Sequence, residues 1–149
     1  MRMFHILPAL CCLSLAMAPG ARADLKAALA ERDLGKRSKL ALDNASDTLK
    51  AAREAVQRGE NEKVVAAVAE IRESVELAHD SLKSTGKDPR KSPKWFKQAE
   101  ISTRELLKKL STLQDDMNFA DRPMLVELKK RVQQVHDELL MGLMEGKQK

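Results

Sequence analysis

Two histidines are the side chains best suited to metal or proton chemistry in the chain that follows the N-terminal apolar segment. His79 and His136 each follow an apolar position of a helical pattern, and Glu76, Asp80 and Asp137 lie nearby in the sequence. Histidine and carboxylate side chains on neighbouring helices can bind a divalent metal. Di-iron helical bundles, however, use a Glu-x-x-His pair on each of two helices, and only Glu76 and His79 have this spacing. We expect two partly exposed histidines and no bound metal, with His79 and His136 as the metal candidates.

A cluster of basic residues occupies the segment from Lys83 to Lys97, in which Asp88 is the only acidic residue. Such a cluster can bind an anion or an anionic membrane surface, with Trp95 at the level of the headgroups. The alternative is a solvated loop, followed by a helical turn that packs Phe96 and Trp95 onto the end of the domain. The candidate anion or partner patch consists of Lys87, Arg90, Lys91, Lys94, Trp95 and Lys97.

The sequence lacks the motifs that carry the common enzyme chemistries. It contains no nucleophile elbow, no glycine-rich phosphate-binding loop and no HExxH zinc helix. Its carboxylates lie mostly on polar helix faces, three or four residues from basic side chains, where charged groups are usually solvated. We expect no enzymatic activity and no catalytic residue.

The segment from Gly59 to His79 resembles, in its spacing, the haem-binding helix of the periplasmic four-helix cytochromes. The resemblance covers one helix and rests on that histidine. It implies a haem with a methionine of another helix as second axial ligand, and the candidates are Met117, Met124, Met141 and Met144. The sequence has no Cys-x-x-Cys-His motif for covalent attachment. One histidine in the core of a helical bundle does not require a cofactor, and we expect no cofactor here.

The N-terminal residues have the features of a cleavable secretory signal peptide, which we assign to residues 1–23. Arg2 precedes an apolar run from Phe4 to Ala18, and small residues stand at positions −3 and −1 of a cleavage site after Ala23. The run is shorter than the ~20 apolar residues of a membrane-spanning helix. We therefore expect cleavage, and no transmembrane segment in the mature chain.

Cleavage at this point changes both the cysteine content and the charge. Cys11 and Cys12 leave with the signal peptide, so the mature chain can form neither a disulfide nor a cysteine metal site. Arg2 and Arg22 also leave, which lowers Lys+Arg from 27 to 25 while all 22 acidic residues remain, and the net charge becomes 25 − 22 = +3. Nucleic-acid-binding domains are more basic than this. We expect an exported protein, periplasmic or secreted, that binds no nucleic acid.

The spacing of apolar residues predicts an all-α fold with four long helices. Apolar residues recur in steps of three and four, whereas a strand would alternate every second residue. The helices are expected near residues 36–58, 61–84, 93–116 and 122–145, after a short helical segment within residues 24–32. Short connections favour an antiparallel up-down-up-down four-helix bundle. Residues 24–149 are of a size that suits a single domain.

These features together lead to two functional hypotheses. The first is an exported, non-enzymatic bundle of the cell envelope that acts through surface contacts with a protein or with the envelope surface. The alternative is a periplasmic bundle that binds a small ligand, a metal or haem through His79, His136 or both. A monomer and a homodimer are both compatible with the helical pattern, because apolar stripes pack equally well within and between chains.

Overall fold

The computed structural model describes residues 24–145, and the predicted signal peptide and its cleavage site lie outside them. Five helices make up the described part of the chain: α1 (Leu25–Ala30), α2 (Leu34–Arg58), α3 (Asn61–Ser84), α4 (Lys94–Asp116) and α5 (Arg122–Glu145). The residues between 24 and 145 form no strand. Within the same range, none of the helices has both the length and the apolar character needed to cross a membrane. The fold is the all-helical bundle that the sequence predicts.

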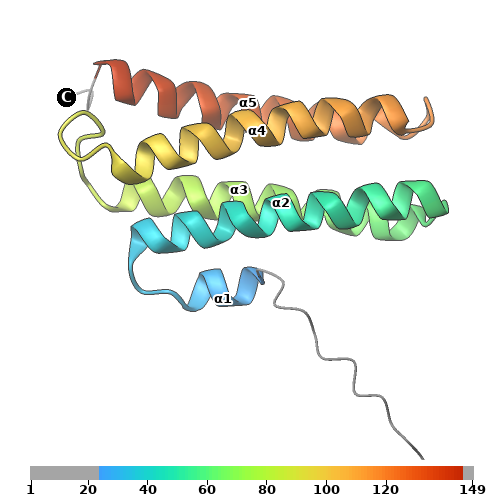
Figure 1. Cartoon of the computed structure of the whole chain (residues 1–149), viewed down its shortest axis with the longest axis horizontal. Coiled ribbons are helices and arrows are strands. Elements are labelled where there is room, and N and C mark those ends of the chain that lie inside the picture. The colour runs from blue at the N-terminus through green and yellow to red at the C-terminus, as the bar shows by residue number, and fades with distance from the viewer. Residues whose placement is uncertain (1–23, 146–149) are drawn as a thin grey trace, which may run out of the picture.

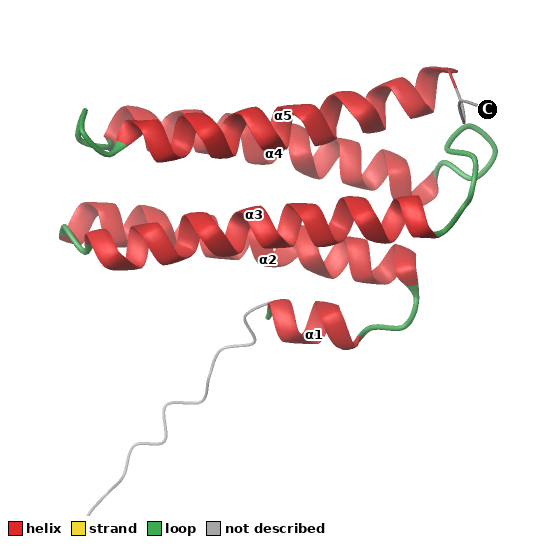
Figure 2. Cartoon of the chain, turned by 180° about the vertical axis from the view of Figure 1, so that it is seen from behind, coloured by secondary structure: helices red, strands yellow, loops and turns green. Residues whose placement is uncertain are grey.

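The four long helices pack around a common core. Helix α2 contacts α3 and α4, and α5 contacts α3 and α4, so each long helix has two main neighbours. Figure 1 shows the chain passing along the bundle in α2, returning in α3, and repeating this course in α4 and α5. Seen from behind in Figure 2, the hairpin of α2 and α3 lies against the hairpin of α4 and α5, with the short α1 beside the first hairpin.

The apolar stripes seen in the sequence form the interior. Ile71 of α3, Leu110 of α4, and Leu125 and Leu128 of α5 are fully buried. These side chains lie three or four residues from other buried side chains of the same helix, which places them on one helical face. Burial of this apolar surface is the main source of stability of the bundle, whose described residues contain no cysteine.

A polar contact fixes the position of α2 against α3 within this apolar interior. The amide Nδ2 of Asn44 donates hydrogen bonds to Oγ of Ser74 at 3.0 Å and to Oε1 of Glu70 at 2.9 Å. Asn44 and Ser74 are both buried. Because an unpaired buried polar group is costly, this arrangement favours one relative position of the two helices.

The helix boundaries differ from the predicted ones at two N-termini. Helix α2 begins at Leu34 rather than near 36, because Asp33 caps it by accepting a hydrogen bond from the backbone N–H of Lys36 at 2.8 Å. Helix α4 begins at Lys94, so Pro93 is its N-cap residue instead of its first helical residue. At the other end of α2 the predicted stop is confirmed, since Gly59 adopts a left-handed conformation with φ of 70°.

Candidate functional site

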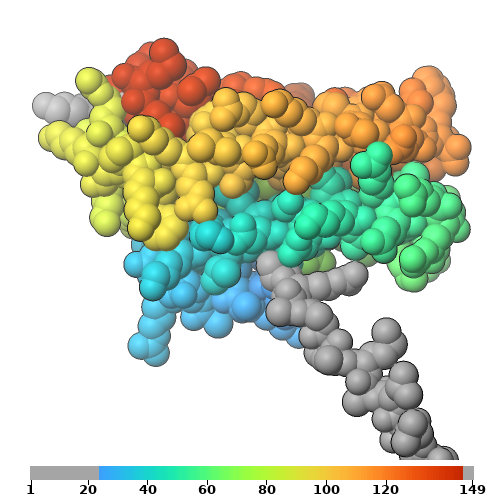
Figure 3. All heavy atoms as spheres, in the orientation of Figure 1, coloured from blue at the N-terminus to red at the C-terminus, as the bar shows by residue number. Residues whose placement is uncertain are grey.

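A pocket lies at one end of the bundle, which we call the loop end. Here the α3–α4 loop, residues 85–93, meets the start of α4 and the C-terminal part of α5, and Figure 3 shows the loop and the end of α5 side by side. The pocket has a volume of about 380 Å³. It is lined by His79, Leu82, Lys83, Gly86, Lys87, Pro89, Phe96, Glu138, Leu139, Met141, Gly142 and Glu145.

The wall of this pocket is mostly apolar, and its polar groups are few. Leu82, Phe96 and Leu139 are core residues whose side chains also face the pocket, and Met141 is exposed at its edge. Pro89 of the loop lies close to Gly142 of α5, where a Cβ atom on residue 142 would stand 3.2 Å from Cγ of Pro89. An apolar wall with a few convergent polar groups is the usual composition of a small-molecule site, and such sites have volumes of about 300–1,000 Å³.

His79 supplies the buried polar group of the pocket. Its Nε2 lies 2.9 Å from Oε2 of Glu138, which joins α3 to α5. Burial lowers the pKa of His79 below its ordinary value, and the positive charges of Lys83 and Arg131 act in the same direction. The carboxylates of Glu138 and Asp80 oppose this shift without reversing it. The Nε2 atom of His79 is thus placed to donate a hydrogen bond to the Glu138 carboxylate whenever it carries a proton.

Trp95, near the start of α4, packs against the start of α2. Trp95 is half-buried, and its indole ring occupies the space where a Cβ atom on Gly35 would stand. The ammonium group of Lys94 lies 4.7 Å from the centre of this ring. A second pocket of about 200 Å³ lies beside Trp95 and shares Leu82, Lys87 and Phe96 with the first. Trp95, which the sequence placed in the candidate patch, thus packs against the bundle.

The basic residues of the candidate patch remain on the surface. Lys83 and five residues of the patch (Lys87, Arg90, Lys91, Lys94 and Lys97) are all exposed. Within residues 24–145 none of these six side chains forms an ion pair with a carboxylate. The carboxylate of Asp88 instead accepts a hydrogen bond from the backbone N–H of Arg90 at 2.9 Å, within the loop. The loop end therefore carries six cationic groups without an internal carboxylate partner.

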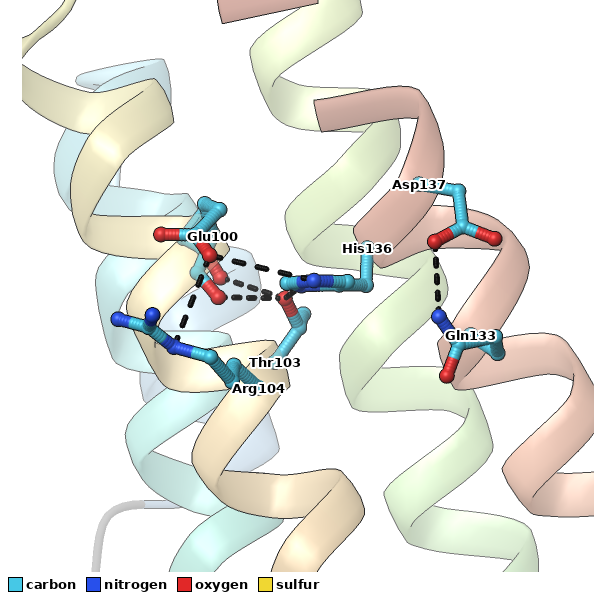
Figure 4. A network of polar contacts seen from close by, with 7 residues as sticks. Glu100, Thr103, Arg104, Gln133, His136 and Asp137 are labelled. Carbon is cyan, nitrogen blue, oxygen red and sulfur yellow. Dashed lines mark hydrogen bonds and ion pairs between the residues drawn. The ribbon is translucent and has the colours of Figure 1, made fainter. Parts of the chain in front are cut away.

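His136 lies in a different interface, between α4 and α5. Its Nδ1 is 3.1 Å from Oγ1 of Thr103, and its Nε2 is 3.9 Å from Oε1 of Glu100 (Figure 4). Oγ1 of Thr103 also lies 2.9 Å from the carbonyl oxygen of Ala99. Arg104 reaches the same Glu100 carboxylate, with Nε at 3.7 Å. This network joins the two helices and has no part in the lining of the loop-end pocket.

The two histidines differ from their expected exposure. His79 is 6% exposed and His136 is 9% exposed, so the expectation that both are partly exposed is wrong. The reason is that each has a polar partner on a neighbouring helix, which satisfies a buried ring nitrogen. Across the described residues no group of three or more His, Cys, Asp or Glu side chains could hold a metal ion.

The methionines considered as haem ligands are divided between the two ends of the bundle. Met141 lines the loop-end pocket together with His79. Met117 and Met124 line a pocket of about 120 Å³ at the opposite end, which we call the turn end. Met144 is 70% exposed. Of the four candidates, the pocket of His79 thus contains one.

Several residues of the pocket carry no signal in the sequence. Leu139, Met141 and Gly142 appear there as ordinary positions of a helix, and Pro89 as an ordinary loop residue. They form a site only because the end of α5 returns to the α3–α4 loop.

In comparisons with known proteins, the chain matches no family model, no curated protein and no solved structure at a significant level.

Proposed function

We propose that this protein is a non-enzymatic binding module that takes a small, largely apolar molecule into the loop-end pocket. The proposal adopts the small-ligand alternative of the two functional hypotheses and assigns it to His79 and its surroundings. The non-enzymatic part rests on the lack of catalytic motifs in the sequence. Export remains a prediction from the N-terminal residues, which lie outside the described part of the chain.

The observation that carries the proposal is the pocket itself. Its volume of about 380 Å³ compares with about 120 Å³ for the pocket at the turn end. Its wall combines Leu82, Phe96 and Leu139 with a single buried polar group, the His79 ring. The apolar wall favours an apolar ligand body through the hydrophobic effect, and the few polar groups can fix the orientation of the ligand.

The direct test is a titration of the protein with octanol, a small neutral molecule with an apolar tail, followed by amide chemical shifts in NMR spectra. We expect saturable shifts confined to the ends of α3 and α5, the start of α4 and the α3–α4 loop. Met141→Trp should weaken binding by at least about tenfold, because an indole at this exposed position would fill the pocket mouth.

Val65→Trp is the matched control for this variant. Val65 is also exposed on a helix and lines a pocket, but that pocket lies at the turn end. We expect it to leave octanol binding unchanged. A lack of saturable shifts, or an equal loss of binding in the two variants, would show that the loop-end pocket is not a binding site.

A second candidate function is contact with an anionic surface of the cell envelope. It is favoured by the six loop-end cations that have no carboxylate partner within residues 24–145, and by the exposed Met141 and Met144 on the adjacent end of α5. The test is sedimentation with phosphatidylglycerol vesicles, with phosphatidylcholine vesicles as the control. Reversing the charges of Lys87, Arg90, Lys91 and Lys94 should reduce sedimentation with the anionic vesicles. Equal sedimentation of this variant and the unaltered protein would count against this function.

A further inference from the structure

We propose that the ligand of the loop-end pocket is a single-chain carboxylic acid, whose apolar tail enters the pocket and whose carboxylate is held by Lys83 and Lys87. This inference rests on the proposed function and names the chemical class of the ligand. It follows from three features of the pocket: the composition of its wall, the position of two lysines in that wall, and the distribution of charge around it.

The two lysines are available for a ligand. Lys83 belongs to the last turn of α3 and Lys87 to the loop that follows, and both line the pocket. Neither is part of an ion pair within the described residues. Other exposed lysines of this protein do pair where a carboxylate is near, as Lys50 does with Asp47 at 3.0 Å. An acid group at the pocket mouth would supply the partner that the fold does not.

The carboxylates of the pocket lie on the opposite wall. Glu138 and Glu145 belong to α5, whereas the two lysines belong to α3 and its loop. Glu138 is already engaged by Nε2 of His79 at 2.9 Å. A ligand carboxylate is therefore favoured on the α3 side and disfavoured on the α5 side, which gives the bound ligand a defined orientation.

The charge beyond the pocket favours an anion over a cation. Arg90, Lys91, Lys94 and Lys97 follow Lys87 in the chain, are exposed, and are unpaired within the described residues. Their combined field attracts an anion towards the pocket mouth and repels a cation. The α5 carboxylates alone would favour a cationic headgroup. The charge of the headgroup that binds most tightly therefore tests whether the lysines or the carboxylates determine the choice of ligand.

The experiment compares three ligands with the same tail: octanoate, octanol and octyltrimethylammonium, each titrated into the full mature chain by calorimetry and NMR. We expect octanoate to bind about five-fold more tightly than octanol, as suits two partly exposed charge contacts. Octyltrimethylammonium should bind more weakly than octanol. Adding salt should reduce the advantage of octanoate and leave octanol binding nearly unchanged.

Two pairs of substitutions separate direct contact from the general positive field. Lys83→Gln combined with Lys87→Gln should lower octanoate affinity more than octanol affinity, so that the preference for octanoate is lost. Arg90→Gln combined with Lys91→Gln removes the same charge from residues that do not line the pocket. This control pair should retain most of the preference for octanoate.

The outcomes distinguish this inference from the proposed function. If octanol does not bind, the proposed function fails. If octanol binds but octanoate binds no more tightly, or the ammonium ligand binds best, the function stands and the acid ligand is wrong. The same conclusion follows if the two double variants lose the preference equally. Attachment to anionic vesicles without binding of free octanoate would also overturn the single-chain acid as the ligand.

Discussion

The two ends of the bundle share the same helices and the same core, yet they differ in the pairing of their charged side chains and in the volume of their pockets. At the turn end, the ion pairs include Arg53 with Asp116 at 3.2 Å and Lys63 with Glu60. The guanidinium of Arg122 donates from Nε to the carbonyl oxygen of Met117 at 3.1 Å. At the loop end six cations have no carboxylate partner among the described residues. The loop-end pocket is about three times larger in volume than the turn-end pocket, 380 against 120 Å³.

This difference follows from the connections between the helices. The turn at Gly59 and the turn after Met117 are short and bring oppositely charged side chains together. Residues 85–93 form a longer connection that passes over the ends of α3 and α5 without filling the space between them. The loop-end pocket and its exposed cations are the reason why we propose the loop end as the binding site.

The largest expected effect comes from the core that both ends share. Leu106 is 3% exposed, and Leu106→Asp would place an unpaired charge among apolar side chains. We expect loss of the cooperative thermal transition, because a penalty of several kcal/mol is comparable with the stability of a small domain, about 5–15 kcal/mol. Circular dichroism during heating measures this. Lys108→Asp on the exposed face of α4 is the control and should melt normally. Unchanged melting of Leu106→Asp would contradict the buried core.

A smaller effect is expected at the loop end alone. A Cβ atom on Gly35 would overlap the indole ring of Trp95, so Gly35→Ala must displace this ring. We expect a loss of about 1–3 kcal/mol in the free energy of unfolding, measured by urea denaturation. In a Trp95→Leu background the same substitution should cost less, because the smaller side chain leaves room. Equal costs in the two backgrounds would mean that Trp95 does not press on Gly35.

The next effect depends on pH and concerns His79. Its pKa in the folded protein is lowered from an ordinary value of 6.5, mainly by burial. The unfolded chain then binds more protons than the folded one, so stability is greatest above the ordinary pKa and falls as the pH decreases through it. Glu138 and Asp80 moderate this loss, and Lys83 and Arg131 add to it.

We therefore expect the free energy of unfolding to decrease between about pH 7 and about pH 5, and to decrease less in His79→Gln, which cannot be protonated. Urea denaturation at a series of pH values gives both slopes. Parallel pH profiles for the two proteins would show that His79 does not titrate differently in the folded and unfolded chains.

The smallest expected effect is on stability, when the unpaired charges of the loop end and a paired charge of the turn end are each reversed. Reversal of Lys87, Arg90, Lys91 and Lys94 breaks no ion pair in the described residues, and we expect a nearly unchanged thermal midpoint. Arg53→Glu at the turn end breaks the pair with Asp116 and should lower stability by up to about 1 kcal/mol, the range of an exposed ion pair. A large loss of stability in the loop variant would show that its charges are structural.

The sequence was sufficient to predict the helical fold, because its apolar spacing and its stop signals are local. The first long helix is predicted to end near residue 58, and α2 ends at Arg58 with Gly59 as its C-cap residue. Gly35 lies between the two predicted helical segments, residues 24–32 and 36–58, yet it belongs to α2, where the Trp95 ring packs against it. Intrinsic propensity disfavours glycine in a helix by about 1 kcal/mol, and a tertiary contact is enough to override it.

The candidate site was less predictable, because its parts come together only in three dimensions. The basic cluster was visible as a run of charges, and the structure keeps those side chains exposed. The burial of His79 was not visible, since its partner Glu138 is distant in the sequence and no local pattern links the two. The apolar wall was equally hidden, because Leu139 and Leu82 have the same helical spacing as core residues elsewhere.

We propose that an apolar ligand enters the bundle between α3, α5 and the α3–α4 loop. The most direct measurement is the set of intermolecular nuclear Overhauser effects between the terminal methyl group of bound octanol and the methyl groups of the protein. For a ligand in the loop-end pocket we expect contacts to Leu82 and Leu139. Contacts to Val64 or Met117 of the turn end instead, or the absence of any contact at saturating ligand, would contradict it.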